Sequence, residues 1–189
     1  MNKDNRIIYL ISGRARNGKG TLSKILKEEY EKRKYRVCEI QIMRTLKGYL
    51  KDYFNWDGSE ETKPRKMLQQ IGTDIIRDEM NLPYFHIDRL TEDIKVLSNF
   101  FDVFIVSDIR LPLEIETIKS RFDNVISINI TRPNYVSPLE TGEQVHITEL
   151  ALNNYKNFDY EIVNSSLGQL TSDIIKIVDS EVNKNEIHD

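Results

Sequence analysis

The sequence predicts an α/β protein built on a doubly wound, five-stranded parallel sheet with helices on both faces. Short runs rich in β-branched and aromatic residues alternate along the chain with longer stretches whose apolar residues recur every three or four positions. The first, third and fourth runs are apolar almost throughout, as expected of parallel strands that are covered on both faces. Strands that alternate with amphipathic helices favour a parallel sheet.

Each element can be assigned a range. Strands are expected at 6–12, 36–42, 101–107, 124–130 and 159–165. Helices are expected at 19–34, 62–80, 83–100, 111–122, 146–158 and 167–182. The stretch 43–100 carries only helical patterns between the second and third strands, and it is too long for a simple crossover. We therefore expect a helical lobe there, within a single domain that covers residues 1–189.

Length and composition exclude several classes of protein. The 189 residues are enough for one domain with a sizeable core, and 39% apolar and 30% charged residues are typical of a globular chain. A net charge of -3 gives no overall preference for nucleic acid or an acidic membrane, and no apolar run is long enough to span a bilayer. The single cysteine, Cys38, excludes an internal disulfide. These features predict a cytoplasmic protein and leave its oligomeric state open.

The segment SGRARNGKGT, residues 12–21, follows the first expected strand and opens the first expected helix. Its spacing, Gly13-x4-Gly18-Lys19, matches the phosphate-binding loop (P-loop) of nucleoside triphosphatases. Glycines let the backbone N–H groups surround phosphates, the helix N-terminus adds a positive dipole, and Lys19 brings an ammonium to the β- and γ-phosphates. The sequence therefore predicts the P-loop NTPase fold and ATP as the cofactor. The residues predicted to bind ATP are Gly13, Arg14, Ala15, Arg16, Asn17, Gly18, Lys19, Gly20, Thr21 and Arg132.

The sequence predicts that magnesium is bound without the usual hydroxyl of the phosphate-binding loop. Gly20 follows the loop lysine, where most such loops carry a Ser or Thr that contacts the metal. Thr21 comes one residue later and points about 100° further round the helix, so a direct contact is doubtful. Asp108, at the carboxyl end of the third strand, would lie beside the loop and orient Mg²⁺ through water. Its alternative role is to cap the helix that follows.

Catalysis is expected to depend on positive charge. Transfer from one phosphate to another needs no strong base, because the acceptor oxygen is already anionic, and the protein must instead offset repulsion and align the two groups. Lys19, Asp108, Arg110 and Arg16 are the predicted catalytic residues. An ordinary surface charge is the alternative for each arginine.

A polar stripe is expected to bind the acceptor. Arg65, Gln69, Thr73 and Arg77 follow one another at intervals of four residues, which places them on one face of a helix, opposite Leu68, Ile71 and Ile75. Arginines grip an anion bidentately, and an amide and a hydroxyl can recognise its other edges. The stripe predicts an acceptor that carries a phosphate, and the alternative is an ordinary exposed polar face.

The segment 132–150 is rich in Pro, Gly, Ser and Thr and lies between a strand and a helix. It is a candidate lid that closes over ATP and excludes water, and the alternative is an ordinary long loop. His146 and Glu149 within it are candidate contacts whose partners the sequence does not reveal.

The order of these motifs resembles the deoxynucleoside monophosphate kinases and, more distantly, the phosphomevalonate kinases of the same P-loop group. The segments that carry the resemblance are SGRARNGKGT, RKMLQQIGTDIIRDEM, YFHIDRL, FIVSDIR, ITRP, HITE and FDYEIVNSSLGQL. The GKGT tetrad is also similar to the loop of adenylate kinases. The resemblance implies ATP-dependent phosphoryl transfer to a small phosphorylated acceptor, with acceptor contacts from the Arg65–Arg77 helix. Gly20 departs from the residues usual in this group.

Two other functions remain open. One is a kinase of another phosphorylated metabolite, of the phosphomevalonate or dephospho-coenzyme A type, and the other is a nucleotide-binding module without catalysis. A GTPase would need an Asn-Lys-x-Asp motif after a late strand to recognise guanine. The nearest match, NKNE from Asn183, does not follow an expected strand. No nucleic acid or membrane partner is expected.

Overall fold

The computed structural model describes residues 6–133 and 150–186. Its strands form one sheet in the order β2-β3-β1-β4-β5, and all neighbours are parallel. The strands are β1 (Ile7–Ser12), β2 (Val37–Ile40), β3 (Val103–Ile109), β4 (Val125–Thr131) and β5 (Tyr160–Val163). Each overlaps its expected range, so the predicted doubly wound α/β sheet is confirmed.

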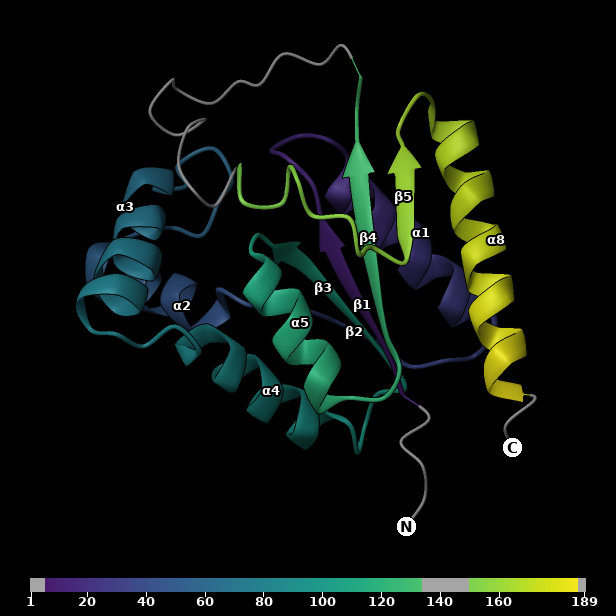
Figure 1. Cartoon of the computed structure of the whole chain (residues 1–189), viewed down its shortest axis with the longest axis horizontal. Helices are drawn as coiled ribbons and strands as arrows, with labels where there is room; N and C mark the ends of the chain where they lie inside the picture. Colours follow the sequence, from purple (N-terminus) through teal and green to yellow (C-terminus); the bar gives the residue numbers. More distant parts are fainter. Residues whose placement is uncertain (1–5, 134–149, 187–189) are drawn as a thin grey trace.

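Helices cover both faces of this sheet (Figure 1). One face carries α1 (Lys19–Lys32) and α8 (Leu167–Glu186), and the other carries α4 (Phe85–Leu97) and α5 (Pro112–Arg121). The central strand β1 serves both, because alternate side chains of a strand point to opposite faces. Ile7, Tyr9 and Ile11 pack with α1 and α8, whereas Ile8 and Leu10 pack with α4 and α5.

The chain between β2 and β3 forms a helical lobe beside the sheet, which Figure 1 shows set off from the strands. The lobe begins with α2 (Arg44–Phe54), and α3 (Arg65–Gln69) then continues directly into a π-helix, η1 (Gln70–Glu79). Leu46, Leu50 and Leu68 form a small core of its own. The part of 43–100 that is set off in this way is α2, α3 and η1, whereas α4 packs on the sheet.

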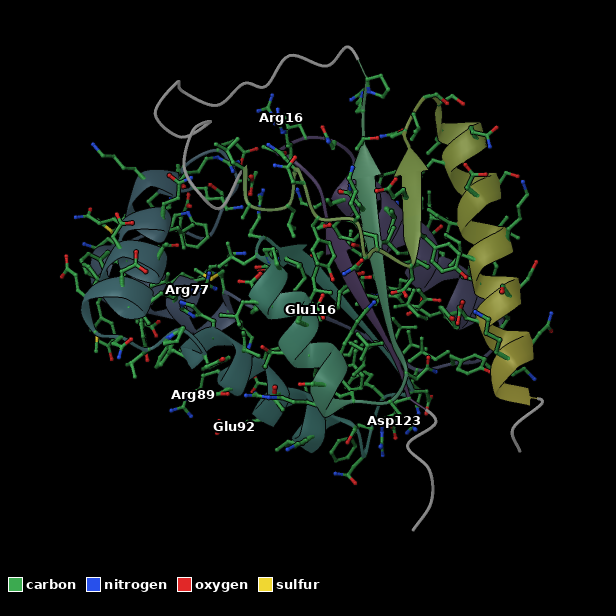
Figure 2. All side chains as sticks on the ribbon, in the orientation of Figure 1. Arg16, Arg77, Arg89, Glu92, Glu116 and Asp123 are labelled. Carbon is green, nitrogen blue, oxygen red and sulfur yellow. The ribbon has the colours of Figure 1, made fainter. Side chains whose placement is uncertain are left out.

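One expected helix is wrong in its described part. Residues 151–158 form turns and irregular backbone, although Leu152, Tyr155 and Phe158 recur three residues apart as in a helix. These three side chains pack against the sheet face that carries α5, and the Tyr155 hydroxyl bonds to Glu116 (labelled on α5 in Figure 2). The periodic apolar residues therefore reflect burial of an irregular segment. In the described ranges, every helix is too short or too polar to traverse a bilayer.

Candidate active site

Two glycines shape the turn between β1 and α1. The backbone of Gly13 has φ 145°, and a Cβ there would lie 2.4 Å from the carbonyl oxygen of Ile130 on β4. Gly18, which precedes α1, has φ 108°, and its Cβ would lie 2.4 Å from Asn164 Nδ2. At Gly13 both the dihedral angle and the Ile130 backbone exclude a larger residue, and at Gly18 the dihedral angle disfavours one.

Hydrogen bonds hold this loop against the carboxyl ends of the strands. Asn17 Nδ2 donates to the Ile130 carbonyl at 3.2 Å, and Asn164 Nδ2 donates to the Asn17 carbonyl at 2.9 Å. The Lys19 ammonium donates to the carbonyl oxygens of Gly13 at 2.6 Å and Arg14 at 3.0 Å. The loop is thus curled around the lysine, at the N-terminal end of α1, where anions are favoured.

A cleft of about 640 Å³ joins this loop to the helical lobe. Of the predicted residues, it brings together Ala15, Arg16, Gly18, Lys19, Gly20, Thr21, Arg65, Asp108, Arg110 and Arg132. Its described lining includes seven Lys or Arg side chains and two carboxylates, those of Glu60 and Asp108. This excess of positive charge suits a ligand with several phosphate groups.

Some predicted residues lie elsewhere. Gly13, Arg14 and Asn17 line a smaller polar hollow of about 160 Å³ on the other side of the loop. Residues 134–149, which include His146, Glu149 and most of the expected lid, lie outside the described residues. Within the described cleft, Gln69 is not a lining residue.

The structure corrects the orientation expected for Thr73 and Arg77. Both are buried, and Arg77 forms an ion pair with Glu114 of α5, with side-chain exposures of 7% and 1%. In Figure 2, Arg77 lies in the lower part of the lobe, well away from Arg16 at the loop. The cause is the π-helix, whose i→i+5 hydrogen bonds replace the α-helical period that the prediction assumed. Ile76 is consequently buried where Ile75 was expected.

Glu114 connects Arg77 to the predicted catalytic Arg110. The Glu114 carboxylate accepts hydrogen bonds from the backbone N–H groups of Arg110 at 2.7 Å and Leu111 at 3.1 Å, and so caps α5. The Arg110 guanidinium donates to the Gly13 carbonyl at 3.4 Å. Arg77 therefore supports the turn that carries Arg110, through a carboxylate, and does not line the cleft.

Asp108 caps a different helix from the one considered above. Its Oδ1 accepts from the backbone N–H of Ile42 at 2.8 Å, and its Oδ2 accepts from Met43 at 3.3 Å, both just before α2. Lys47 Nζ on α2 lies 3.3 Å from the same Oδ2. Asp108 thus joins the end of β3 to the lobe while lining the cleft, and the capping role expected for it at α5 belongs to Glu114.

Of the two carboxylates that line the cleft, Asp108 is the candidate for a magnesium ion, because Glu60 is paired with Lys63 and Arg65. The described residues contain no group of three or more His, Cys, Asp or Glu side chains that could hold a metal. Mg²⁺ usually keeps several waters and binds through one or two carboxylates together with substrate phosphates. The donor set around Asp108 therefore fits a metal carried by a nucleotide and fits poorly with an all-protein site.

His86 of α4 is completely buried beside the lobe, and burial, reinforced by the positive charge of Arg77, lowers its pKa from 6.5 to about 4. Between pH 6.5 and 4, His86 is therefore protonated in the unfolded chain but stays neutral in the folded chain. We expect the free energy of unfolding to fall as the pH is lowered through this window. Urea denaturation of His86→Leu should show a flatter pH dependence, and parallel profiles for the two proteins would contradict the assignment.

Comparison with known proteins places the chain in a family. The model of the deoxynucleotide monophosphate kinase family matches residues 41–174, which is more than half of the chain. This chain belongs to the deoxynucleotide monophosphate kinase family. The family is one of phosphotransferases that act on a phosphorylated substrate, and the match covers the lobe, Asp108 and the segment after β5. The match begins after the loop at 12–21, so phosphate binding by that loop is predicted from its own spacing and geometry.

Two individual similarities accompany the family match. A protein of Acanthamoeba polyphaga mimivirus, provisionally named a deoxynucleotide monophosphate kinase, is 30% identical over 126 residues. The match covers 62% of this chain and 62% of that protein, so the chain spans less than two thirds of the relative's length. A structure of the Mycobacterium tuberculosis APS kinase CysC in complex with AMPPNP and APS has a TM-score of 0.51. At 11% identity over 92% of this chain and 98% of that chain, it supports the fold alone.

The sequence reasoning missed several residues of the cleft. Lys47 and Asn164 both line the cleft. In the sequence, Lys47 resembles an ordinary surface lysine, and Asn164 resembles a residue of a turn after the last strand. A signal did exist for Lys63. It stands with Arg65 and Lys66 around Pro64 at the start of α3, where the helix dipole favours acidic side chains. Because cationic side chains are unfavourable at a helix N-terminus, a cluster of them there indicates a binding site for an anion.

Proposed function

We propose that this protein transfers the γ-phosphate of ATP to a deoxynucleoside monophosphate. The observation that carries the proposal is the cleft that the P-loop shares with the helical lobe, with seven cationic side chains in its described lining. The family match spans the lobe, and the loop geometry suits a polyphosphate. A donor at the loop and an acceptor at the lobe would then meet within one positively charged space.

The P-loop is the donor site in this proposal. The N-terminus of α1 and the loop N–H groups face the phosphates, and Lys19 exchanges its bonds to the Gly13 and Arg14 carbonyls for bonds to phosphate oxygens. The cleft extends to Asn164–Leu167 after β5, where Leu167 is an exposed apolar side chain. We assign this end to the nucleoside part of ATP.

Positive charge then offsets the repulsion between donor and acceptor. Arg16, Arg110 and Arg132 line the same cleft as Lys19 and are assigned to the transferring phosphoryl group. Asp108 would hold Mg²⁺ through water, and the ion would neutralise charge on the phosphates of ATP. The acceptor needs no general base, because its attacking oxygen is already ionised.

A panel of acceptors tests this function. The protein is incubated with ATP, Mg²⁺ and each of the four deoxynucleoside monophosphates, their ribonucleotide counterparts, phosphomevalonate and dephospho-coenzyme A, and the products are separated by chromatography. We expect the diphosphate of at least one deoxynucleoside to form. Transfer to a non-nucleotide alone would reassign the protein to the metabolite kinases. ADP release that no acceptor changes would contradict the proposal.

A further inference from the structure

A second hollow of about 340 Å³ lies next to the cleft, along α2. Gln41, Lys47, Glu60 and Lys63 line both spaces, so these four residues mark the place where the two spaces meet. Beyond this junction the hollow continues along one side of α2 and the turn that follows it, away from the P-loop residues. Its volume lies within the range of about 300 to 1,000 Å³ that is usual for small-molecule sites.

The junction carries more positive than negative charge. Lys47 Nζ lies 3.3 Å from Asp108 Oδ2, and Lys63 Nζ lies 2.9 Å from Glu60 Oε2. Arg65 pairs with the same Glu60, so three cations share two carboxylates. Burial lowers the pKa of the Lys63 ammonium, and the charges of Lys47 and Arg65 act in the same direction. A dianionic phosphate monoester placed here would relieve this crowding of like charges.

The hollow beyond the junction has room and an aromatic wall. Gly48 of α2 faces it, and a Cβ added at Gly48 would meet no atom within 4 Å. Trp56 also lines the hollow, and Lys51 Nζ lies over its ring, 5.6 Å from the centre, where a base would take the place of the lysine. A flat aromatic side chain beside a cationic rim is a surface that suits a nucleobase and its sugar.

We propose that the acceptor nucleotide occupies this second hollow, with its phosphate at the junction between Lys47 and Lys63 and its nucleoside along α2 at Gly48 and Trp56. The inference rests on the proposed function and specifies its acceptor site. In this proposal Arg77 is no longer an acceptor-binding residue, because it lies outside the cleft. Arg65, at the other end of the predicted stripe, remains one. The acceptor phosphate would then face the P-loop across the cleft that contains Lys19.

Lys63→Gln tests the phosphate end of the site. It removes a charge-assisted contact to the acceptor, so the acceptor KM should rise by roughly ten- to a hundredfold while the ATP KM changes by less than about twofold. Lys63→Arg, which keeps the charge, should recover most of the affinity. Lys66→Gln is the matched control, because Lys66 is an exposed lysine three residues along that does not line the described part of either space. It should leave both KM values unchanged.

Gly48→Leu tests the nucleoside end. A leucine within a helix is intrinsically favoured over glycine and would enter the empty space at this position, so the fold should be retained while the acceptor is excluded. We expect the acceptor KM to rise at least about tenfold and binding of a non-hydrolysable ATP analogue to stay unchanged. Gly168→Leu on α8 is the control, because a Cβ at Gly168 also meets open space.

Calorimetric titration of the four deoxynucleoside monophosphates into each variant, with the ATP analogue present, separates this inference from the proposed function. If the wild type transfers phosphate but Lys63→Gln and Gly48→Leu bind acceptor as well as their controls do, the inference is wrong and the function stands. If transfer is absent but both variants lose binding that the controls keep, the site is supported and the function fails. Wild-type protein that binds no monophosphate would overturn the inference.

Discussion

Replacing Lys19 by alanine is expected to slow phosphoryl transfer by at least about a hundredfold to a thousandfold, which is the usual cost of removing one group that stabilises the charge of a transition state. The Lys19 ammonium lies within the curl of the loop, bonded to the carbonyl oxygens of Gly13 and Arg14, and lines the cleft. Single-turnover formation of the deoxynucleoside diphosphate measures the effect.

Lys24→Ala is the control for that variant. Lys24 lies on the same helix, but its side chain is 77% exposed and its ion pair with Glu28 is on the surface. We expect it to keep the wild-type rate within about twofold, because exposed pairs of this kind contribute little. A Lys19→Ala protein that unfolds like the wild type yet keeps more than a tenth of its rate would contradict the assignment of Lys19.

The second large effect is expected at Arg77, on stability. Arg77→Ala leaves the Glu114 carboxylate buried without its ionic partner, which should lower the free energy of unfolding by about 3 to 5 kcal/mol. The same loss would loosen the turn that carries Arg110, because Glu114 bonds to its backbone N–H. Urea denaturation at neutral pH gives the stability, and turnover of the folded fraction reports on Arg110.

Two comparisons separate this account from a role of Arg77 in acceptor binding. Arg89→Ala removes an exposed arginine that pairs with Glu92 on the same helix, and it should cost less than about 1 kcal/mol. The double variant Arg77→Met with Glu114→Gln removes both charges and should be more stable than Arg77→Ala alone. If Arg77→Ala instead keeps full stability and only raises the acceptor KM, the original sequence-based assignment would be restored.

Local patterns were enough to predict the sheet and the loop. Parallel strands buried on both faces are apolar over their buried length, and residues 7–11 and 103–106 have that character in the sequence itself. Gly13 and Gly18 have positive φ angles that disfavour other residues, so the spacing of these two glycines in the sequence reflects the geometry of the loop. Asp108 was predicted beside the loop because ligands gather at the carboxyl ends of parallel strands, and it lines the same cleft as the loop; its role toward Mg²⁺ stays a prediction.

The acceptor-binding residues could not be predicted from the helical repeat of the sequence alone. The stripe from Arg65 to Arg77 assumed 3.6 residues per turn, but the helix changes to i→i+5 hydrogen bonding at Gln70. That change buries Thr73 and Arg77, and a buried arginine then needs a buried carboxylate from another element. Nothing in the local sequence of the helix identifies Glu114, which lies 37 residues away, as that partner.

The junction of the two spaces could not be predicted from the sequence either, because it depends on tertiary contacts. Lys47 comes from α2 and Lys63 from the irregular segment just before α3, and nothing in the sequence indicates that the two lie together. They come together because Asp108 caps α2 and because the lobe packs on its own small core of leucines. Sequence spacing carries no information on such an arrangement, apart from the cations at the start of α3.

The central claim is that one continuous space holds donor and acceptor end to end, and a bisubstrate analogue tests it most directly. The analogue joins adenosine to a deoxynucleoside through five phosphates, and its dissociation constant is compared with that of the non-hydrolysable ATP analogue. We predict binding at least about a hundredfold tighter for the joined molecule, with the advantage lost in Gly48→Leu. Binding no tighter than that of the ATP analogue would mean that only the donor half is held, and would contradict the account.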